Sequence, residues 1–177
     1  MLPVSKYHGC GNDFIILREE DAAGYDLKTL IPAVCDRHTG LGADGFILVR
    51  TCPLTMIFYN CDGSRAPMCG NGIRCFAKFC LDEGLVDGEC LAVETLAGPK
   101  MVTVASRDPF LAQVAMGKAD FSPESIGVEH SGPALDFPVP VEGKKILVDS
   151  FFPLIRFRRI RAFQARLFNH SSTSPRM

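Results

Sequence analysis

Short apolar runs, bounded by glycine, aspartate and asparagine, recur along most of the chain. Such runs between turn-forming residues are typical of buried β-strands. We therefore predict strands over 14–17, 46–49, 56–59, 101–104 and 111–116. Strand character resumes over 139–148, where Glu142 and Gly143 predict a turn.

Two segments have the period of a helix instead. The stronger is 72–83, where apolar residues recur at i, i+3, i+4 and i+7 and Gly84 occupies the position that ends a helix. The other is 26–37, with Asp26 as its N-cap. Many strands and one long helix with an apolar face predict an α+β fold, a sheet curled over a central helix.

The C-terminal part of the chain differs in composition from the rest. Proline and glycine cluster between 122 and 140, which indicates a crossing between domains. Residues 150–177 contain six of the 19 basic residues and none of the 20 acidic ones. Apolar residues from Phe157 to Leu167 have helical spacing among these arginines, so a basic amphipathic helix is one interpretation of this segment.

The composition narrows the classes of function that the protein can have. The chain has 177 residues, a net charge of −1 and 47% hydrophobic residues. It contains no apolar run long enough to span a bilayer, and residues 1–10 contain no apolar core of the length found in signal peptides. We expect a cytoplasmic protein without a membrane partner. Its eight cysteines should then be reduced and mostly buried, and because no C-x-x-C pair occurs, we expect no metal site.

Four glycine-rich polar clusters interrupt the strands, at 8–14, 37–45, 60–64 and 68–75. Each alone is consistent with an ordinary turn. The last is more specific, because Cys69 directly precedes a Gly-Asn-Gly turn that opens the stronger helix. Backbone N–H groups and the positive helix end there favour a thiolate and can also bind a carboxylate.

Cys69 is therefore a candidate for nucleophilic attack or for proton transfer at carbon. A nucleophile would need a base, for which His8 and His38 are available and His130 and His170 are weaker candidates. Sequence spacing ties none of these histidines to Cys69.

Taken in order, the four clusters closely resemble the N-terminal half of the diaminopimelate epimerases. The resemblance rests on the runs YHGCGNDF, RHTGLGADG, YNCDGSRAPMCGNGIRCFAKF and VETLAGPKMV, and continues more weakly to about residue 145. Proline racemases share the fold, but they typically carry histidine at the position of Asn71. Asn71 therefore favours an epimerase over the alternative, a proline racemase-like isomerase.

The resemblance implies two similar domains, each a mixed or antiparallel sheet wrapped around a central helix, with the substrate between them. It implies cofactor-independent interconversion of L,L- and meso-diaminopimelate, a step of lysine biosynthesis, by two cysteines facing opposite sides of the α-carbon. Cys69 matches the first cysteine. The positions that hold the small-molecule amino-acid substrate are matched by Asn12, Asn60, Gly70 and Asn71.

The resemblance also implies a second domain with its own cysteine, which this chain does not contain. We expect an N-terminal domain at 1–118, the incomplete start of a second similar domain at 119–149, and an atypical basic tail at 150–177. The chain should then be a truncated, inactive form. The alternative is a non-catalytic remnant that binds an amino acid or a protein partner.

Three further expectations concern binding and packing. Nucleic-acid binding by the tail would rest on charge alone, so we expect no nucleic-acid partner. Homodimer formation is left open. Cys10 and Cys61 stand where relatives more usually carry leucine and alanine, and we expect both to pack as small apolar residues.

Overall fold

The computed structural model describes residues 2–118, 120–126, 132–133, 135–151 and 154–157. The chain divides into two compact units, Met1–Met116 and Gly117–Met177. Among the described residues, no helix has the length and apolar character that crossing a bilayer requires.

The first unit begins with a four-stranded mixed sheet in the order β1-β2-β3-β4. The strands are β1 (Ser5–Gly9), β2 (Asn12–Arg18), β3 (Gly45–Thr51) and β4 (Leu54–Asn60). β2 and β3 run parallel, and the two outer pairs are antiparallel. In consequence the first residues of β2 and β3 and the last residues of β4 lie at the same end of the strands.

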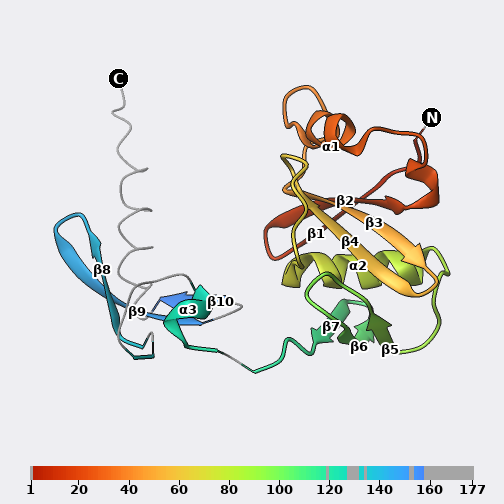
Figure 1. Cartoon of the computed structure of the whole chain (residues 1–177). Coiled ribbons are helices and arrows are strands. Elements are labelled where there is room, and N and C mark those ends of the chain that lie inside the picture. The colour runs from red at the N-terminus through yellow and green to blue at the C-terminus, as the bar shows by residue number, and fades with distance from the viewer. Residues whose placement is uncertain (1, 119, 127–131, 134, 152–153, 158–177) are drawn as a thin grey trace, which may run out of the picture. The chain divides into compact units, whose positions relative to one another are not determined.

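The helix α2 (Gly70–Asp82) packs on one face of this sheet (Figure 1). A second, antiparallel sheet lies on its other side and contains β5 (Cys90–Val93), β6 (Lys100–Arg107) and β7 (Phe110–Val114). The two sheets meet at one edge, where Thr55 bridges Glu94. The unit is therefore a sheet that curls around a central helix, as the sequence predicts.

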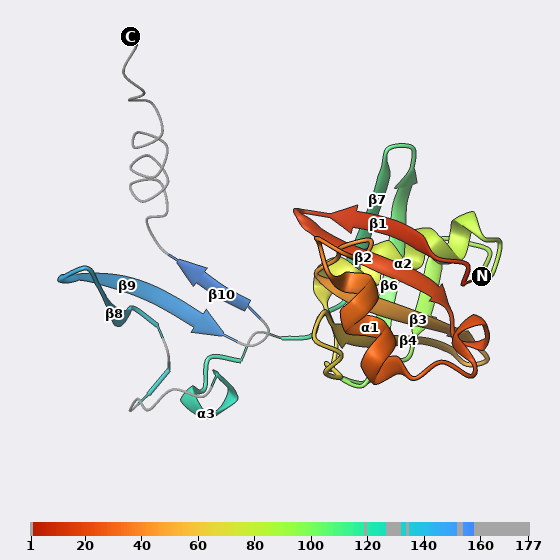
Figure 2. The same ribbon diagram turned by 90° about the horizontal axis from the view of Figure 1, so that it is seen from above.

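The opposite face of the four-stranded sheet carries α1 (Leu27–Cys35), preceded by a 3₁₀ turn at Glu20–Ala22 (Figure 2). Because both faces are covered, successive residues of a strand are buried alternately in the core on the α2 side and in the core on the α1 side. Phe14 and Ile16 pack with α2, whereas Ile15 and Leu17 pack with α1. This explains the continuous apolar runs in the sequence.

The predicted helices and strands of the first unit form, but they begin and end at other residues than predicted. All five predicted strands of this unit form, and β2, β3, β4 and β6 extend one to three residues beyond the apolar runs. α1 ends at Cys35, two residues earlier than predicted, because the Asp36 carboxylate accepts hydrogen bonds from the backbone of His38 and Thr39. The predicted N-cap, Asp26, accepts from the backbone N–H of Lys28.

The second unit contains α3 (Pro123–Ile126) and an antiparallel sheet in the order β10-β9-β8. Its strands are β8 (Phe137–Val141), β9 (Lys144–Phe151) and β10 (Leu154–Phe157). Glu142 and Gly143 form the predicted turn between β8 and β9, both with positive φ. The boundaries at 118 and 149 stay predictions, and the predicted basic helix after Phe157 lies outside the described residues.

Candidate active site

Cys69 is the N-cap of α2. Its backbone is extended, and its Sγ accepts a hydrogen bond from the backbone N–H of Gly72 at 3.4 Å. The helix therefore begins at Gly70, two residues before the predicted start, because Cys69 takes the capping role that serine or aspartate usually fills. A sulfur atom in this position lies at the positive end of the helix, beside backbone N–H donors.

Gly72 allows the start of α2 to approach the sheet. A Cβ atom on Gly72 would lie 3.1 Å from Cε of Met56, 3.2 Å from Cβ of Cys69 and 3.4 Å from Cδ1 of Ile47. These are close contacts, so the absence of a side chain at this position fixes how deeply the first turn, and Cys69 with it, sits against the sheet.

The Asn71 side chain connects this turn to the β1–β2 hairpin. Its Nδ2 donates to Oδ1 of Asn12 at 2.6 Å, and its Oδ1 accepts a hydrogen bond from the guanidinium of Arg74. Asn12 begins β2 directly after a tight turn in which Cys10 and Gly11 both have positive φ. Two of the predicted substrate residues, far apart in sequence, are thus brought into direct contact.

A network of charged residues supports Asn12 from the other side. Its Nδ2 donates to Oδ2 of Asp44 at 3.3 Å, and Arg37 bridges Asp44 and Asp13 at 2.8 and 2.7 Å. Hydrogen bonds from Arg37 hold the pKa of Asp13 well below its usual range, with a further contribution from Lys6. The 37–45 cluster is therefore connected to the 8–14 cluster by ion pairs.

Asn60 lies at the same end of the strands as Asn12 but is not joined to this network. It is the last residue of β4 and pairs with Gly45, which in turn pairs with Phe14 of β2. Two strand spacings, roughly 10 Å, therefore separate Asn60 from Phe14. Its Nδ2 donates to Oγ of Ser64 at 2.9 Å, and within the described part of the chain no hydrogen bond joins it to another candidate residue.

Gly70 is the first residue of α2, so its backbone N–H and that of Asn71 have no acceptor inside the helix. A Cβ on Gly70 would meet only Cε of Met116, at 3.8 Å. The chain therefore presents N–H donors suited to an anion next to Cys69.

The other cysteines differ from expectation in their exposure. Four of the eight are exposed, including Cys10 and Cys61, so the prediction that these two pack in the core is wrong: they lie in turns, and Cys10 Sγ accepts from Arg74 at 3.3 Å. Cys35, Cys75 and Cys80 are buried. Burial raises the pKa of Cys35 and Cys75 to about 11, and that of Cys80 to about 12.

The histidines give no support to a nucleophile with a histidine base. Among the described residues, no histidine makes a hydrogen bond to Cys69, and His38 is held at the end of α1 by its backbone bond to Asp36. His130 and His170 lie outside the described residues.

Comparison with known proteins assigns the chain to a family. The sequence profile of the diaminopimelate epimerases matches residues 4–122. The chain belongs to the diaminopimelate epimerase family. Diaminopimelate epimerases of Alkaliphilus metalliredigens and Moorella thermoacetica are 41% and 43% identical to it, over 82% and 78% of its length. The chain covers only 54% and 52% of these two proteins, about half the length of the relatives it matches.

Solved structures support the epimerase-like fold. A hydroxyproline epimerase from Agrobacterium vitis matches with a TM-score of 0.58 at 14% identity, covering 82% of this chain and 46% of that one. A probable proline racemase from Agrobacterium radiobacter matches with a TM-score of 0.56 at 16% identity, covering 82% and 47%. Both confirm the predicted α+β fold of the family.

Sequence reasoning missed the residues that support the site. Asp13, Arg37, Asp44 and Arg74 all lie within the four glycine-rich clusters. Their charges among glycines could have indicated ion pairs between clusters, but pairing partners depend on the strand order, which the sequence alone did not provide.

Proposed function

We propose that this chain supplies one half of the active site of a diaminopimelate epimerase, in which Cys69 transfers the α-proton of the substrate. The observation that carries the proposal is the placement of Cys69 on the first turn of α2, the turn whose Asn71 is paired with Asn12. The reaction is the conversion of L,L- to meso-diaminopimelate without a cofactor, a step of lysine biosynthesis in the cytoplasm.

The chemistry explains why these groups belong together. The α-proton of an amino acid is a weak acid, so its removal needs a thiolate and stabilisation of the charge that develops on the α-carboxylate. The thiolate takes the proton and forms an S–H bond, while the C–H electron pair moves into the carboxylate. The N–H groups of Gly70 and Asn71, at the positive end of α2, would stabilise that charge.

The proposed substrate residues are held in two different ways. Asn12 and Asn71 are held by a continuous set of hydrogen bonds, whereas Asn60 is held by its own loop through Ser64. Together with Gly70, these residues would hold the α-carboxylate, the α-amino group and the distal end of the substrate. Holding a substrate in one geometry is itself a large part of catalysis.

Inversion at the α-carbon needs an acid on the face opposite the base. A single thiol that returns the proton to its own face regenerates the starting isomer. All eight cysteines of the 177-residue chain lie at or before Cys90. Under this proposal Cys69 is one of the two reacting thiols. We infer that this chain alone does not produce the meso isomer.

Substrate protection of the thiols tests the proposal. Iodoacetamide labelling of the whole chain, mapped by mass spectrometry with and without saturating diaminopimelate, should show slower labelling of Cys69 when the amino acid is present. The exposed Cys52 and Cys90 serve as internal controls and should not change. Asn12→Ala should weaken the protection. Equal labelling of Cys69 with and without diaminopimelate would contradict the proposal.

A further inference from the structure

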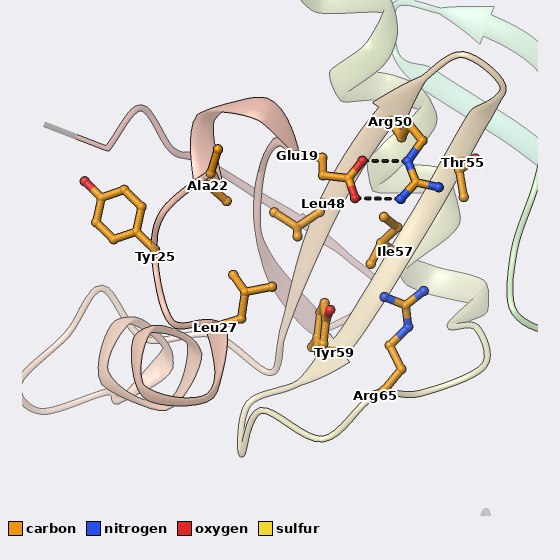
Figure 3. A pocket seen from close by; sticks show the side chains of 11 residues that line it. Glu19, Ala22, Tyr25, Leu27, Leu48, Arg50, Thr55, Ile57, Tyr59 and Arg65 are labelled. Atoms are coloured by element: carbon orange, nitrogen blue, oxygen red, sulfur yellow. Dashed lines mark hydrogen bonds and ion pairs between the residues drawn. The ribbon is translucent and has the colours of Figure 1, made fainter.

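Arg74 is the fifth residue of α2, and its side chain is half-buried. In the part of the chain that the structure describes, no carboxylate lies within ion-pair distance of its guanidinium. Arg50, by contrast, makes two hydrogen bonds of 2.6 Å to Glu19 in the pocket on the α1 face of the sheet (Figure 3). A cation near the positive end of a helix is not stabilised by the helix dipole. The groups to which Arg74 donates therefore indicate its role.

One nitrogen of the Arg74 guanidinium donates two hydrogen bonds. Its Nη2 donates to Oδ1 of Asn71 and to Sγ of Cys10, the latter at 3.3 Å. Arginine cannot accept a hydrogen bond, whereas an asparagine side chain donates from its nitrogen and accepts at its oxygen. Arg74 therefore keeps the oxygen of Asn71 turned toward the guanidinium, which leaves Nδ2 of Asn71 to donate to Asn12.

The pair of Asn71 and Asn12 is held less firmly at its other end. Nδ2 of Asn12 donates to Oδ2 of Asp44 at 3.3 Å, which is long for an N–H···O bond. The same oxygen also accepts from the backbone N–H of Asp13, and Asp44 is exposed to water. Arg74 is thus the stronger determinant of how the two asparagine amides are oriented.

We propose that Arg74 is a positioning residue of the candidate active site, which acts on the substrate through Asn71. This rests on the proposed function, in which Asn71 and Asn12 hold the amino acid. With Arg74 in place, the side of Asn71 next to Asn12 presents N–H groups. A reversed amide would present an oxygen there, which cannot donate to a substrate carboxylate. The affinity for the amino acid then depends on an arginine that does not touch it.

The orientation of the amides can be measured in the free chain, without diaminopimelate. In ¹⁵N spectra of the whole chain, Arg74→Met should shift the side-chain NH₂ signals of Asn12, because the effect passes from Asn71 to Asn12. In an Asn71→Ala background, Arg74→Met should leave the Asn12 signals in place. Asn12 signals that are the same in Arg74→Met and in the parent chain would overturn the proposal.

The effect on binding is measured by the protection of Cys69 from iodoacetamide at increasing diaminopimelate. Arg74→Met should raise the concentration for half-protection about tenfold, as expected for the loss of one hydrogen bond from a charged group. Arg74→Lys keeps a donor and should restore part of the affinity. Two controls should leave the affinity unchanged: Cys10→Ala, which removes the other bond of the same guanidinium, and Lys78→Met, which removes a cation one turn further along α2.

A double variant separates positioning from direct contact with the substrate. When Asn71 is already alanine, Arg74→Met should change the half-protection concentration less than about twofold. An effect that persists in Asn71→Ala, or an unchanged affinity in Arg74→Met, would overturn the proposal. If diaminopimelate does not protect Cys69 in the parent chain, the proposed function fails, whereas the spectra of the free chain still decide whether Arg74 orients the amides.

Discussion

The side-chain amide of Asn71 donates to the side-chain oxygen of Asn12 at 2.6 Å, which fixes the first turn of α2 to the start of β2. This contact is the second of three consecutive side-chain hydrogen bonds, a directed series in which each residue donates to the next. Arg74 donates to Asn71, Asn71 donates to Asn12, and Asn12 donates to Asp44. Each asparagine amide is held by the residues on either side of it, so the series fixes the orientation of both side chains.

The coupling between the two asparagines can be measured with a double-mutant cycle. We expect Asn12→Ala and Asn71→Ala each to lower the free energy of unfolding by about 1 kcal/mol, with a coupling energy of the same order, since they share one hydrogen bond. Urea denaturation of the single and double variants measures this. Asn60→Ala is the matched control, and it should add to Asn71→Ala without coupling. Simple additivity of the Asn12 and Asn71 variants would contradict the directed series.

The ion pairs of Asp13 predict a pH dependence of stability. Because the pKa of Asp13 is lowered in the folded state, its contribution is present above the usual carboxylate pKa of about 4 and is lost as the pH falls toward the folded value. Arg37→Gln should therefore be less stable than the parent chain at pH 7, and the difference should shrink as the pH falls below about 4.

The measurement is a series of urea titrations from pH 7 to pH 3 on both chains. Arg107→Gln is a suitable control, because Arg107 is exposed and takes no part in the Asp13 network. A difference between Arg37→Gln and the parent chain that stays constant over this range would mean that Asp13 is not the partner responsible.

The thiols should differ in reactivity according to their surroundings. We expect Cys69 to be alkylated fastest at neutral pH, because its Sγ lies at the positive end of α2 and accepts a hydrogen bond from the N–H of Gly72. At pH 7.5 a thiol with a pKa near 11, such as Cys35 or Cys75, has about one molecule in several thousand ionised. Mass mapping of iodoacetamide adducts decides, and faster labelling of Cys10 or Cys61 would show the prediction to be wrong.

The sequence predicted the middle part of both helices and of most strands of the first unit, but not the residues at which they begin and end. Apolar runs mark only the part of a strand that is buried on both faces, so the polar ends of β2 and β4, which carry Asn12 and Asn60, were missed. β1 was missed completely, because Ser5–Gly9 is half-buried and contains no apolar run. β5 was missed as well, although Cys90–Val93 is a run of four apolar residues.

The candidate site could be predicted only in part. Cys69, Gly70 and Asn71 are adjacent in sequence, so a local pattern was enough to group them. Asn12 joins Asn71 through a contact between distant segments, and the supporting ion pair of Arg37 with Asp44 depends on β2 and β3 lying side by side. The resemblance to the family indicated Asn12 and Asn60, but not the network that holds Asn12.

The central claim, that Cys69 is one of two reacting thiols, is tested most directly by proton NMR of L,L-diaminopimelate in D₂O with the 177-residue chain. We predict slow replacement of the α-proton by deuterium with retention of configuration, absent in Cys69→Ser, and no meso isomer. Loss of one member of an acid and base pair alone typically slows a reaction by about 10² to 10⁴. Formation of meso-diaminopimelate at a rate near that of a full-length epimerase, or deuterium exchange that persists in Cys69→Ser, would contradict the account.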